Sequence, residues 1–248
     1  MRMIISPAKK MHSEPKPLAW QNMPKFLEEA DDLRNYLYSL SYSDAKKLWK
    51  CNDKIAALNF ERFASMDVRK PQNPAILAYE GIQYQYMAPA VFETKSLAYV
   101  EEHLRILSGF YGLLRPFDGI VAYRLEMQAK INWKGFESLY DYWGDRLAQQ
   151  MAEETDCIVN LASKEYSRSI RKYWSDDRKW IDVIFGERLD GKIKEKGTMV
   201  KMARGEMVRY MAEHHAEKPE TMKGFNRLGY CFDEKLSDET TYVFVMCK

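Results

Sequence analysis

The chain has 248 residues, of which 46% are hydrophobic and 30% charged, so it holds enough apolar material for a sizeable core. Its net charge of +2 excludes the strongly basic overall balance of many nucleic-acid-binding proteins. No apolar run approaches the roughly 20 residues of a membrane helix and the start lacks the apolar segment of a secretory signal, so we expect one cytoplasmic domain over residues 1–248.

The first half of the chain shows alternating strand and helix patterns. Pro7 ends the first apolar run, and Pro24 suits the first turn of a helix with a 3.6-residue apolar period. In chain order the patterns predict a strand at 3–5, a helix at 24–40, a helix capped by Ser43, helical residues 50–64, a strand at 75–79 closed by Gly81, a helix from 97 that stops at Ser108-Gly109, and a short helix at 111–114.

The second half is richer in predicted strands. It is expected to contain a helix at 136–151, an interior strand at 157–161, strands at 180–185, 198–203, 230–232 and 242–246, a helix at 206–215, and a hairpin signal at Asp190-Gly191. No repeat or long linker interrupts these elements. We therefore predict an α/β (α+β) fold, a single compact domain with a mixed β-sheet wrapped by helices.

Charge is distributed unevenly along the chain. Residues 164–209 hold 13 Lys or Arg and 8 acidic residues, which gives this segment a charge of +5. Such an asymmetry either creates a local positive surface or belongs to a solvated face of mixed charge.

The four cysteines and four histidines show no spacing typical of a metal site. We therefore expect reduced, mostly buried thiols, no metal and no cofactor.

Six segments combine residues that core packing does not require. They are ISPAK at 5–9, LRILSGFYGLLRPFD at 104–118, YRLEM at 123–127, YDYWGD at 140–145, NLASKEY at 160–166 and KMARGEMVRYM at 201–211. In this order they resemble the YaaA family of bacterial peroxide-stress proteins, and the resemblance extends to GYCFDE at 229–234. It implies a mixed α/β domain, a cytoplasmic location, a role in limiting iron-linked oxidative damage, and binding of double-stranded DNA through a helix-hairpin-helix.

The best match to a helix-hairpin-helix is the segment 97–116, read as two short helices joined by a glycine-containing turn. Turn glycines let backbone N–H groups approach a phosphate without reading the base sequence. The alternative is an ordinary helix corner with a C-terminal glycine cap. With basic residues of the later segment added, the predicted DNA-binding residues are Arg105, Ser108, Gly109, Tyr111, Gly112, Arg115, Lys201, Arg204 and Arg209.

A second set of polar residues follows predicted strands, where open α/β sheets form a crevice. Ser163 either lines this crevice or caps the N-terminus of the next helix. Arg124 and Glu126 share one face of a predicted strand, where they either line the crevice or form a structural ion pair. Lys201 is expected on a strand, with Gly205 opening the next helix. The cleft candidates are Ser6, Lys9, Arg124, Glu126, Asn160, Ser163 and Glu165.

These features lead to two hypotheses of different class. The first is a non-enzymatic, monomeric peroxide-stress protein that binds double-stranded DNA without strong sequence preference. The second is an enzyme of unknown reaction whose cleft is formed by Lys9, Arg124, Glu126, Asn160, Ser163, Glu165 and Arg204.

Overall fold

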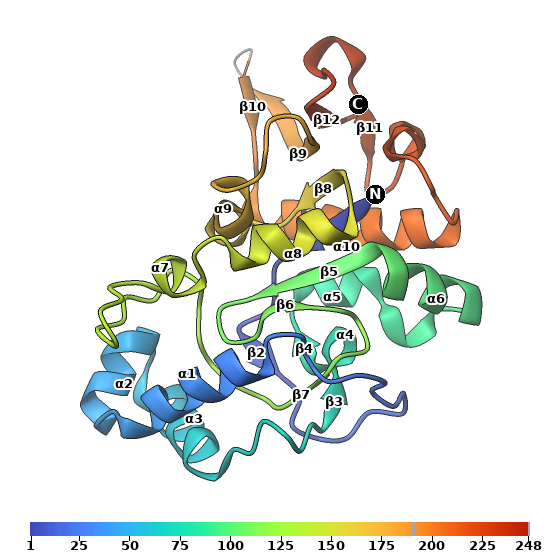
Figure 1. The fold of residues 1–248 in the computed structure, drawn as a ribbon. Helices are drawn as coiled ribbons and strands as arrows, with labels where there is room; N and C mark the ends of the chain where they lie inside the picture. The colour runs from blue at the N-terminus through green and yellow to red at the C-terminus, as the bar shows by residue number, and fades with distance from the viewer. Residues whose placement is uncertain (190–191, 248) are drawn as a thin grey trace.

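A mixed eight-stranded sheet lies at the centre of the computed structural model, which describes residues 1–189 and 192–247 (Figure 1). Its strand order is β11-β12-β9-β8-β1-β5-β6, with β10 paired to β9. The inner strands run parallel, whereas β6, β10 and β11 are antiparallel to their neighbours. The strands are β1 (Arg2–Ile5), β5 (Leu104–Ser108), β6 (Gly112–Leu114), β8 (Cys157–Leu161), β9 (Lys179–Leu189), β10 (Lys192–Lys194), β11 (Tyr230–Phe232) and β12 (Thr241–Met246).

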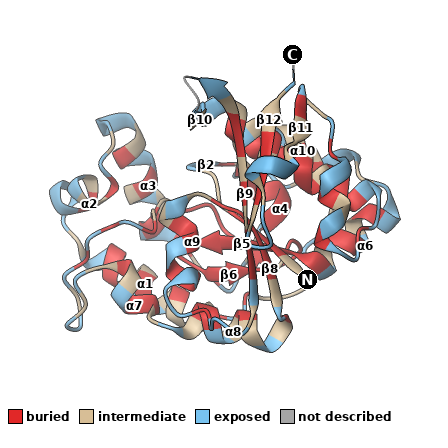
Figure 2. Ribbon diagram, turned by 90° about the horizontal axis from the view of Figure 1, so that it is seen from above, coloured by how far each residue is buried: buried red, intermediate tan, exposed pale blue. Residues whose placement is uncertain are grey.

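Helices cover both faces of this sheet. Seen from above, α9 lies on one side of the strands and α6 and α10 on the other, while buried residues concentrate in the strands between them (Figure 2). The helices are α1 (Leu27–Ser39), α2 (Tyr42–Trp49), α3 (Asp53–Ser65), α4 (Ala75–Ala78), α5 (Ile82–Met87), α6 (Thr94–His103), α7 (Leu139–Trp143), α8 (Arg146–Glu154), α9 (Lys164–Arg171) and α10 (Gly197–Glu213). The predicted α/β class with a mixed sheet and helices is confirmed.

Two pairs of very short strands complete the β-structure. They are β2 (Lys10–Met11) with β4 (Tyr79–Glu80), and β3 (Asn73–Pro74) with β7 (Gly119–Ile120). None of the helices within residues 1–189 and 192–247 is long and apolar enough to cross a membrane.

The strand order creates a crevice between β1 and β8. The chain leaves β1 for β5 on one side and leaves β8 for β9 on the other, so the two connections run in opposite directions along the sheet. In open α/β sheets, ligands bind where such connections diverge, beyond the carboxyl ends of the strands. Ser6 follows β1 and Ala162 follows β8, so this crevice lies beside two of the predicted polar motifs.

The predicted helix-hairpin-helix at 97–116 is wrong. The helix α6 ends at His103, and residues 104–108 and 112–114 form the antiparallel hairpin β5–β6. All residues from 104 to 114 are buried, because β5 is an interior strand beside β1. A run that is apolar on every side fits a buried helix and a buried strand equally well, and the pairing with β1 decides the outcome.

The glycines of this hairpin serve packing. A Cβ atom on Gly109 would lie 2.7 Å from the carbonyl oxygen of Leu125, and one on Gly112 would lie 2.8 Å from the ring of Trp143. Gly112 also has a φ of +70°, a conformation that favours glycine. Neither backbone is open to a phosphate.

Other boundaries also differ from the predictions. Residues 198–203 belong to α10 because this helix packs along α5, so the strand expected there is wrong and Gly205 lies inside the helix. The expected strand at 75–79 is mostly helix α4, the expected helix at 136–151 is divided into α7 and α8, and Ser41 caps α2 in place of Ser43. The Asp190-Gly191 signal lies outside the described residues.

Strands β1, β8, β9, β11 and β12 and the helix α1 lie where they were predicted. Each of these elements is an apolar run bounded by turn residues, and such a run predicts a strand or helix from the local sequence alone.

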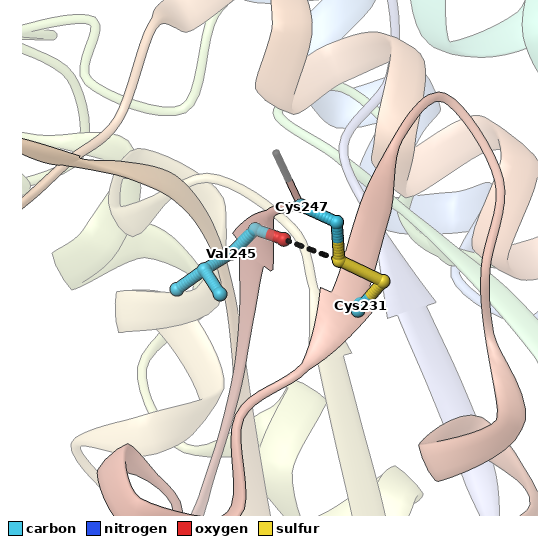
Figure 3. Close-up of a disulfide and its surroundings, with 3 residues drawn as sticks. All are labelled: Cys231, Val245 and Cys247. Carbon is cyan, nitrogen blue, oxygen red and sulfur yellow. Dashed lines mark hydrogen bonds between the residues drawn. A yellow bond between two sulfur atoms is a disulfide. The ribbon is translucent and has the colours of Figure 1, made fainter.

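Two of the four cysteines do not match the expected reduced thiols. Cys231 on β11 and Cys247 just after β12 are joined by a disulfide across the antiparallel pair (Figure 3). The Sγ of Cys247 lies 3.9 Å from the carbonyl oxygen of Val245. Cys51 and Cys157 are free and half-buried.

A buried carboxylate in the turn after β6 predicts a pH effect on stability. Asp118 is 1% exposed, and burial raises its pKa from 3.8 to about 6, although its oxygens accept hydrogen bonds from the backbone N–H and Nε of Arg115. The folded state therefore holds the proton more tightly than the unfolded chain. Asp118 contributes stability that is fully present below about pH 4 and is lost as pH rises through about 6.

We expect the Asp118→Asn variant to remove this effect. Relative to the unaltered protein, its free energy of unfolding should rise by roughly 2–3 kcal/mol between about pH 4 and pH 6, which is two pKa units. Urea unfolding of both proteins at the two pH values measures this difference. A difference that does not change with pH would show that Asp118 is ionised in the folded protein across this range.

Candidate functional site

A cavity of about 970 Å³ opens between α9 and α10. Its floor comes from the end of β8 and the middle of β9, and its walls come from the two helices. Among its lining residues are six basic and two acidic ones: Lys164, Arg168, Arg171, Lys172, Lys201, Arg204, Asp182 and Glu195. The cavity therefore carries an excess of positive charge inside a chain of nearly neutral net charge.

These six basic side chains are uncompensated. None of them forms an ion pair within residues 1–189 and 192–247, whereas basic residues elsewhere, such as Arg69 and Arg227, each pair with two carboxylates. The guanidinium groups of Arg168 and Arg171 lie over the rings of Tyr140 and Trp180. Stacking on aromatic rings orients these cations but leaves their charge available to an anion.

Arg204 is the deepest cation of the cavity. Its Nε is buried and has no hydrogen-bond partner in the described part of the chain. Burial lowers the pKa of Arg204, and the nearby carboxylates of Glu195 and Asp182 oppose this shift. Removing a cation from water without a paired partner is costly, so an anion bound here would gain an interaction that the protein does not satisfy itself.

The floor is fixed by a hydrogen-bond network. Asp182 Oδ1 accepts hydrogen bonds from Asn160 Nδ2 at 2.7 Å and from Trp180 Nε1 at 3.0 Å. Asn160 and Asp182 are paired across β8 and β9, so the sheet register brings them together. Asn160 Oδ1 accepts from the backbone N–H of Ala162, which orients the amide. Because both donors use Oδ1, the other carboxylate oxygen of Asp182 has no partner within the described ranges.

The crevice between β1 and β8 is bridged by two serines. Ser6 Oγ accepts a hydrogen bond from the backbone N–H of Ser163 at 2.9 Å and donates to Ser163 Oγ at 3.2 Å. Ser163 is the N-cap residue of α9, as the alternative interpretation held, but its side chain makes no capping hydrogen bond. Ser163 and Asn160 line the cavity, whereas Ser6 holds Ser163 in place from β1.

The remaining cleft candidates form a second cluster. Glu126 binds Lys9 Nζ at 2.9 Å through one oxygen and Arg124 at 2.6 Å through the other, so these three charges largely satisfy one another. The segment is irregular, so the strand expected around Arg124 and Glu126 is wrong, but their predicted ion pair is present. Burial raises the pKa of Glu165 on α9, and the nearby Glu126 adds to this shift.

Of the seven residues of the enzyme hypothesis, Asn160, Ser163 and Arg204 line the cavity and the other four belong to this second cluster. Across residues 1–189 and 192–247, no group of three or more His, Cys, Asp or Glu side chains is placed to hold a metal ion.

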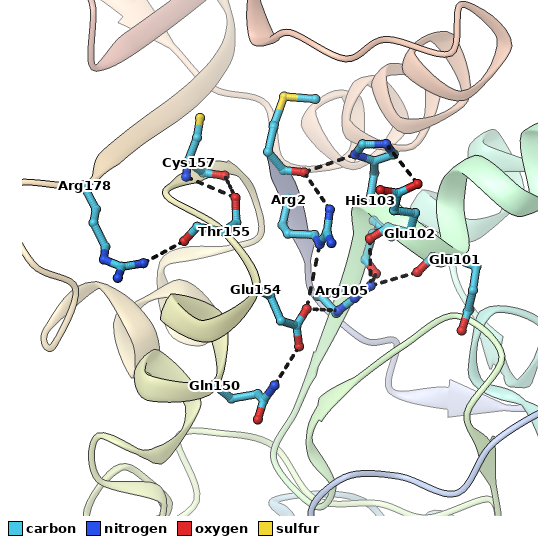
Figure 4. Close-up of polar contacts among 12 residues, drawn as sticks. Arg2, Glu101, Glu102, His103, Arg105, Gln150, Glu154, Thr155, Cys157 and Arg178 are labelled. Carbon is cyan, nitrogen blue, oxygen red and sulfur yellow. Dashed lines mark hydrogen bonds and ion pairs between the residues drawn. The ribbon is translucent and has the colours of Figure 1, made fainter.

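Most of the predicted DNA-binding residues are unavailable to a ligand. Arg105 lies at the amino end of β5, the sheet edge opposite the crevice, and is 6% exposed. Its Nε binds Glu154 at 2.6 Å, and Nη1 donates to the carbonyl oxygen of Glu101 (Figure 4). Ser108, Gly109, Tyr111 and Gly112 are buried, so this part of the prediction is wrong.

The other four predicted DNA-binding residues divide into two pairs. Arg115 binds Asp118 and Arg209 binds Glu213, so their charges are neutralised. Lys201 and Arg204 line the cavity, although Lys201 is on a helix and not on the strand that was expected.

The sequence placed the cations of α9 in the positive segment 164–209 but did not single them out as site residues, although their spacing carried a signal. Lys164, Arg168 and Lys172 are spaced four residues apart, which places them on one face of a helix. These cations line a cavity only because α10 lies opposite them, and the local sequence does not predict that packing.

Two helices joined by a short turn do occur elsewhere, at α2 and α3, where residues 50–52 connect them. Lys46 and Lys47 on α2 are paired with Asp53 and Asp44, whereas Lys50 in the turn and Lys54 on α3 are exposed and form no ion pair with any described residue. The α9–α10 cavity differs from this hairpin in bringing six such cations around one concave surface.

Comparison with known proteins gives a consistent result over nearly the whole chain. The model of a family described as peroxide stress protein YaaA matches residues 1–236. A UPF0246 protein of Lachnoclostridium phytofermentans is 54% identical over 245 residues, which cover 99% of this chain and 96% of the relative. UPF0246 proteins of Desulfitobacterium hafniense and Pediococcus pentosaceus are 53% and 48% identical, each over 99% of this chain and 98% of the relative.

Proposed function

Since the chain belongs to the family of the peroxide stress protein YaaA, we propose that it acts as a cytoplasmic monomer that binds double-stranded DNA through the basic cavity between α9 and α10. The single observation that supports this proposal is the set of six cations that lack ion-pair partners within the described residues. The proposal replaces the buried β5–β6 hairpin as the site of DNA contact.

The exposed cations of α9 and its C-cap residue Lys172 are the primary contacts to the phosphates. Lys164, Arg168 and Lys172 are exposed, and successive members are about 6 Å apart along the helix axis, from 1.5 Å per residue. Arg171 and Lys201 are exposed on the same cavity rim. Like charges gathered in this way repel one another, and a bound polyanion relieves that repulsion.

Contacts of this kind explain the expected lack of sequence preference. Lysine and arginine bound to phosphates set the position of a duplex but read no base, and they displace counterions. A fluorescence-polarisation titration of the full-length protein against a labelled duplex tests the proposal. Binding should weaken steeply with added salt and differ little between duplexes of unrelated sequence. An affinity that is absent even at low salt contradicts the proposal.

We further propose that DNA binding helps to limit iron-dependent oxidative damage, which the family resemblance implies. Plasmid DNA treated with Fe²⁺ and hydrogen peroxide should be nicked more slowly with the protein present. A variant that no longer binds DNA should give no protection. Equal nicking with and without the protein contradicts this second step.

The ion pair of Arg105 gives a contrasting prediction. We expect Arg105→Met to lower the free energy of unfolding by about 2 kcal/mol, the range for a hydrogen bond to a charged group, because Glu154 loses its closest partner but keeps Arg2 and Gln150 nearby. Duplex affinity should stay within about twofold, since Arg105 lies at the opposite sheet edge and touches no phosphate. Urea unfolding and polarisation measure the two quantities. A large loss of duplex affinity in the folded variant would indicate that Arg105 contacts DNA, as the sequence predicted.

A further inference from the structure

The floor of the cavity differs chemically from its rim. The rim carries exposed cations, whereas the floor combines the half-buried Arg204 with Asp182, Asn160 and the hydroxyl of Ser163. A cavity of about 970 Å³ is at the upper end of the sizes that hold one small molecule. A DNA duplex is too wide to enter a cavity of this size, and it contacts proteins over a broad surface of roughly 1,000–2,500 Å². A duplex bound to the rim would therefore leave the floor of the cavity unfilled.

The floor contains one hydrogen-bond donor group without an acceptor and one acceptor atom without a donor. The guanidinium of Arg204 donates no hydrogen bond, and Asp182 has one carboxylate oxygen that accepts none, both within residues 1–189 and 192–247; the Nε of Arg204 is sealed by protein, so a ligand would meet the terminal Nη atoms. The carboxylate of Asp182 lies near enough to Arg204 to stabilise its charge, yet no hydrogen bond joins the two. A ligand that carries both an anionic oxygen and a hydroxyl donor would satisfy both groups at once.

Asp182 is held in position for this role. Its Oδ1 is fixed by Asn160 and Trp180, so the direction of the free oxygen is set before a ligand arrives. A fixed acceptor loses little entropy on binding, and a carboxylate accepts hydrogen bonds from sugar hydroxyls readily. Lys201 is one helical turn before Arg204 on α10 and lines the same cavity, so it supplies a second cation for the anionic group.

We infer that the cavity floor binds one small sugar phosphate, for which AMP is the probe, with Arg204 and Lys201 holding the phosphate and the free oxygen of Asp182 accepting a hydroxyl of the sugar. This site shares Lys201 with the proposed DNA contact of the rim, but it does not require that DNA binds.

Isothermal titration of the full-length protein with AMP tests the inference. We expect one AMP bound per chain, and adenosine, which lacks the phosphate, should bind at least tenfold more weakly. Arg204→Met should lower AMP affinity at least tenfold. The matched control is Arg209→Met on the same helix, because Arg209 pairs with Glu213 and does not line the cavity. This control should bind AMP like the unaltered protein.

The role of Asp182 is tested with a second ligand. The unaltered protein should bind 2′,3′-dideoxyadenosine monophosphate at least fivefold more weakly than AMP, because the sugar hydroxyls are missing. The Asp182→Ala variant, which lacks a side-chain hydrogen-bonding group, should bind both ligands equally. Retention of the full fivefold preference in the folded Asp182→Ala variant would show that Asp182 does not contact the sugar.

The same proteins separate this inference from the DNA proposal. The rim variant Lys164→Gln/Arg168→Gln/Lys172→Gln should lose duplex affinity but keep AMP affinity within about threefold, since these cations lie on the exposed rim. The inference is overturned if AMP produces no binding heat, or if its affinity is the same in the folded Arg204→Met variant.

Discussion

The triple variant Lys164→Gln/Arg168→Gln/Lys172→Gln is expected to bind duplex DNA about 100-fold more weakly than the unaltered protein. Each exposed cation that meets a phosphate contributes about 1 kcal/mol, and three such contacts amount to about two powers of ten in affinity. The slope of log affinity against log salt should become less negative by about 3, because three fewer counterions are displaced. Polarisation titrations over a series of salt concentrations measure both quantities.

A control with the same change in charge is Lys25→Gln/Lys95→Gln/Lys218→Gln. These lysines are exposed, form no ion pair with any described residue, and do not line the cavity. All six substituted side chains are exposed, so neither triple variant should unfold. The control should keep duplex affinity within about threefold. Equal losses in the two variants would mean that overall charge, and not the α9–α10 cavity, attracts DNA.

Gly205→Leu is expected to destabilise the protein by about 4 kcal/mol, the upper range for inserting side-chain atoms into a packed interface. The first added atom would lie 2.2 Å from the carbonyl oxygen of Gln83 and 2.9 Å from the backbone nitrogen of Met87. Both belong to α5, whose backbone cannot give way without moving from α10. Thermal unfolding should show a melting temperature lower by roughly 8–16 °C.

Gly197→Leu provides the matched substitution on the same helix. Gly197 is exposed, and a Cβ atom there meets nothing within 4 Å, so leucine should leave the melting temperature within about 2 °C. If the two variants were equally stable, the close contact between α5 and α10 would not exist. That contact matters for the site because it fixes α10, which carries Lys201 and Arg204.

The segment 104–114 shows why the site was predicted in the wrong place. Its apolar residues, two glycines and two flanking arginines fit a phosphate-binding hairpin and a buried β-hairpin equally well by local pattern. The difference is made by the pairing of Met3, Ile4 and Ile5 with residues 104–106, about one hundred positions later in the chain. Local propensities differ by less than about 1 kcal/mol per residue, so long-range pairing and burial override them.

The crevice was predicted more successfully than the helix-hairpin-helix. Ser6, Asn160 and Ser163 follow strands that the sequence marks clearly, and parallel strands bring their carboxyl ends to one edge. Lys9, Arg124 and Glu126 also meet, but they satisfy one another as an ion cluster. The sequence therefore predicts that these residues lie near the carboxyl edge of the sheet. It does not predict which of them line the cavity.

By itself, the sequence determined the family of this protein, the α/β class, five of its sheet strands and the positive segment 164–209, since each depends on residue identity or on short-range periodicity. The tertiary structure alone decided that residues 104–114 are buried and that the cations of α9 and α10 surround one cavity. The reason is physical: burial and charge proximity depend on which distant segments pack together, and the free energy of that packing is shared over the whole core.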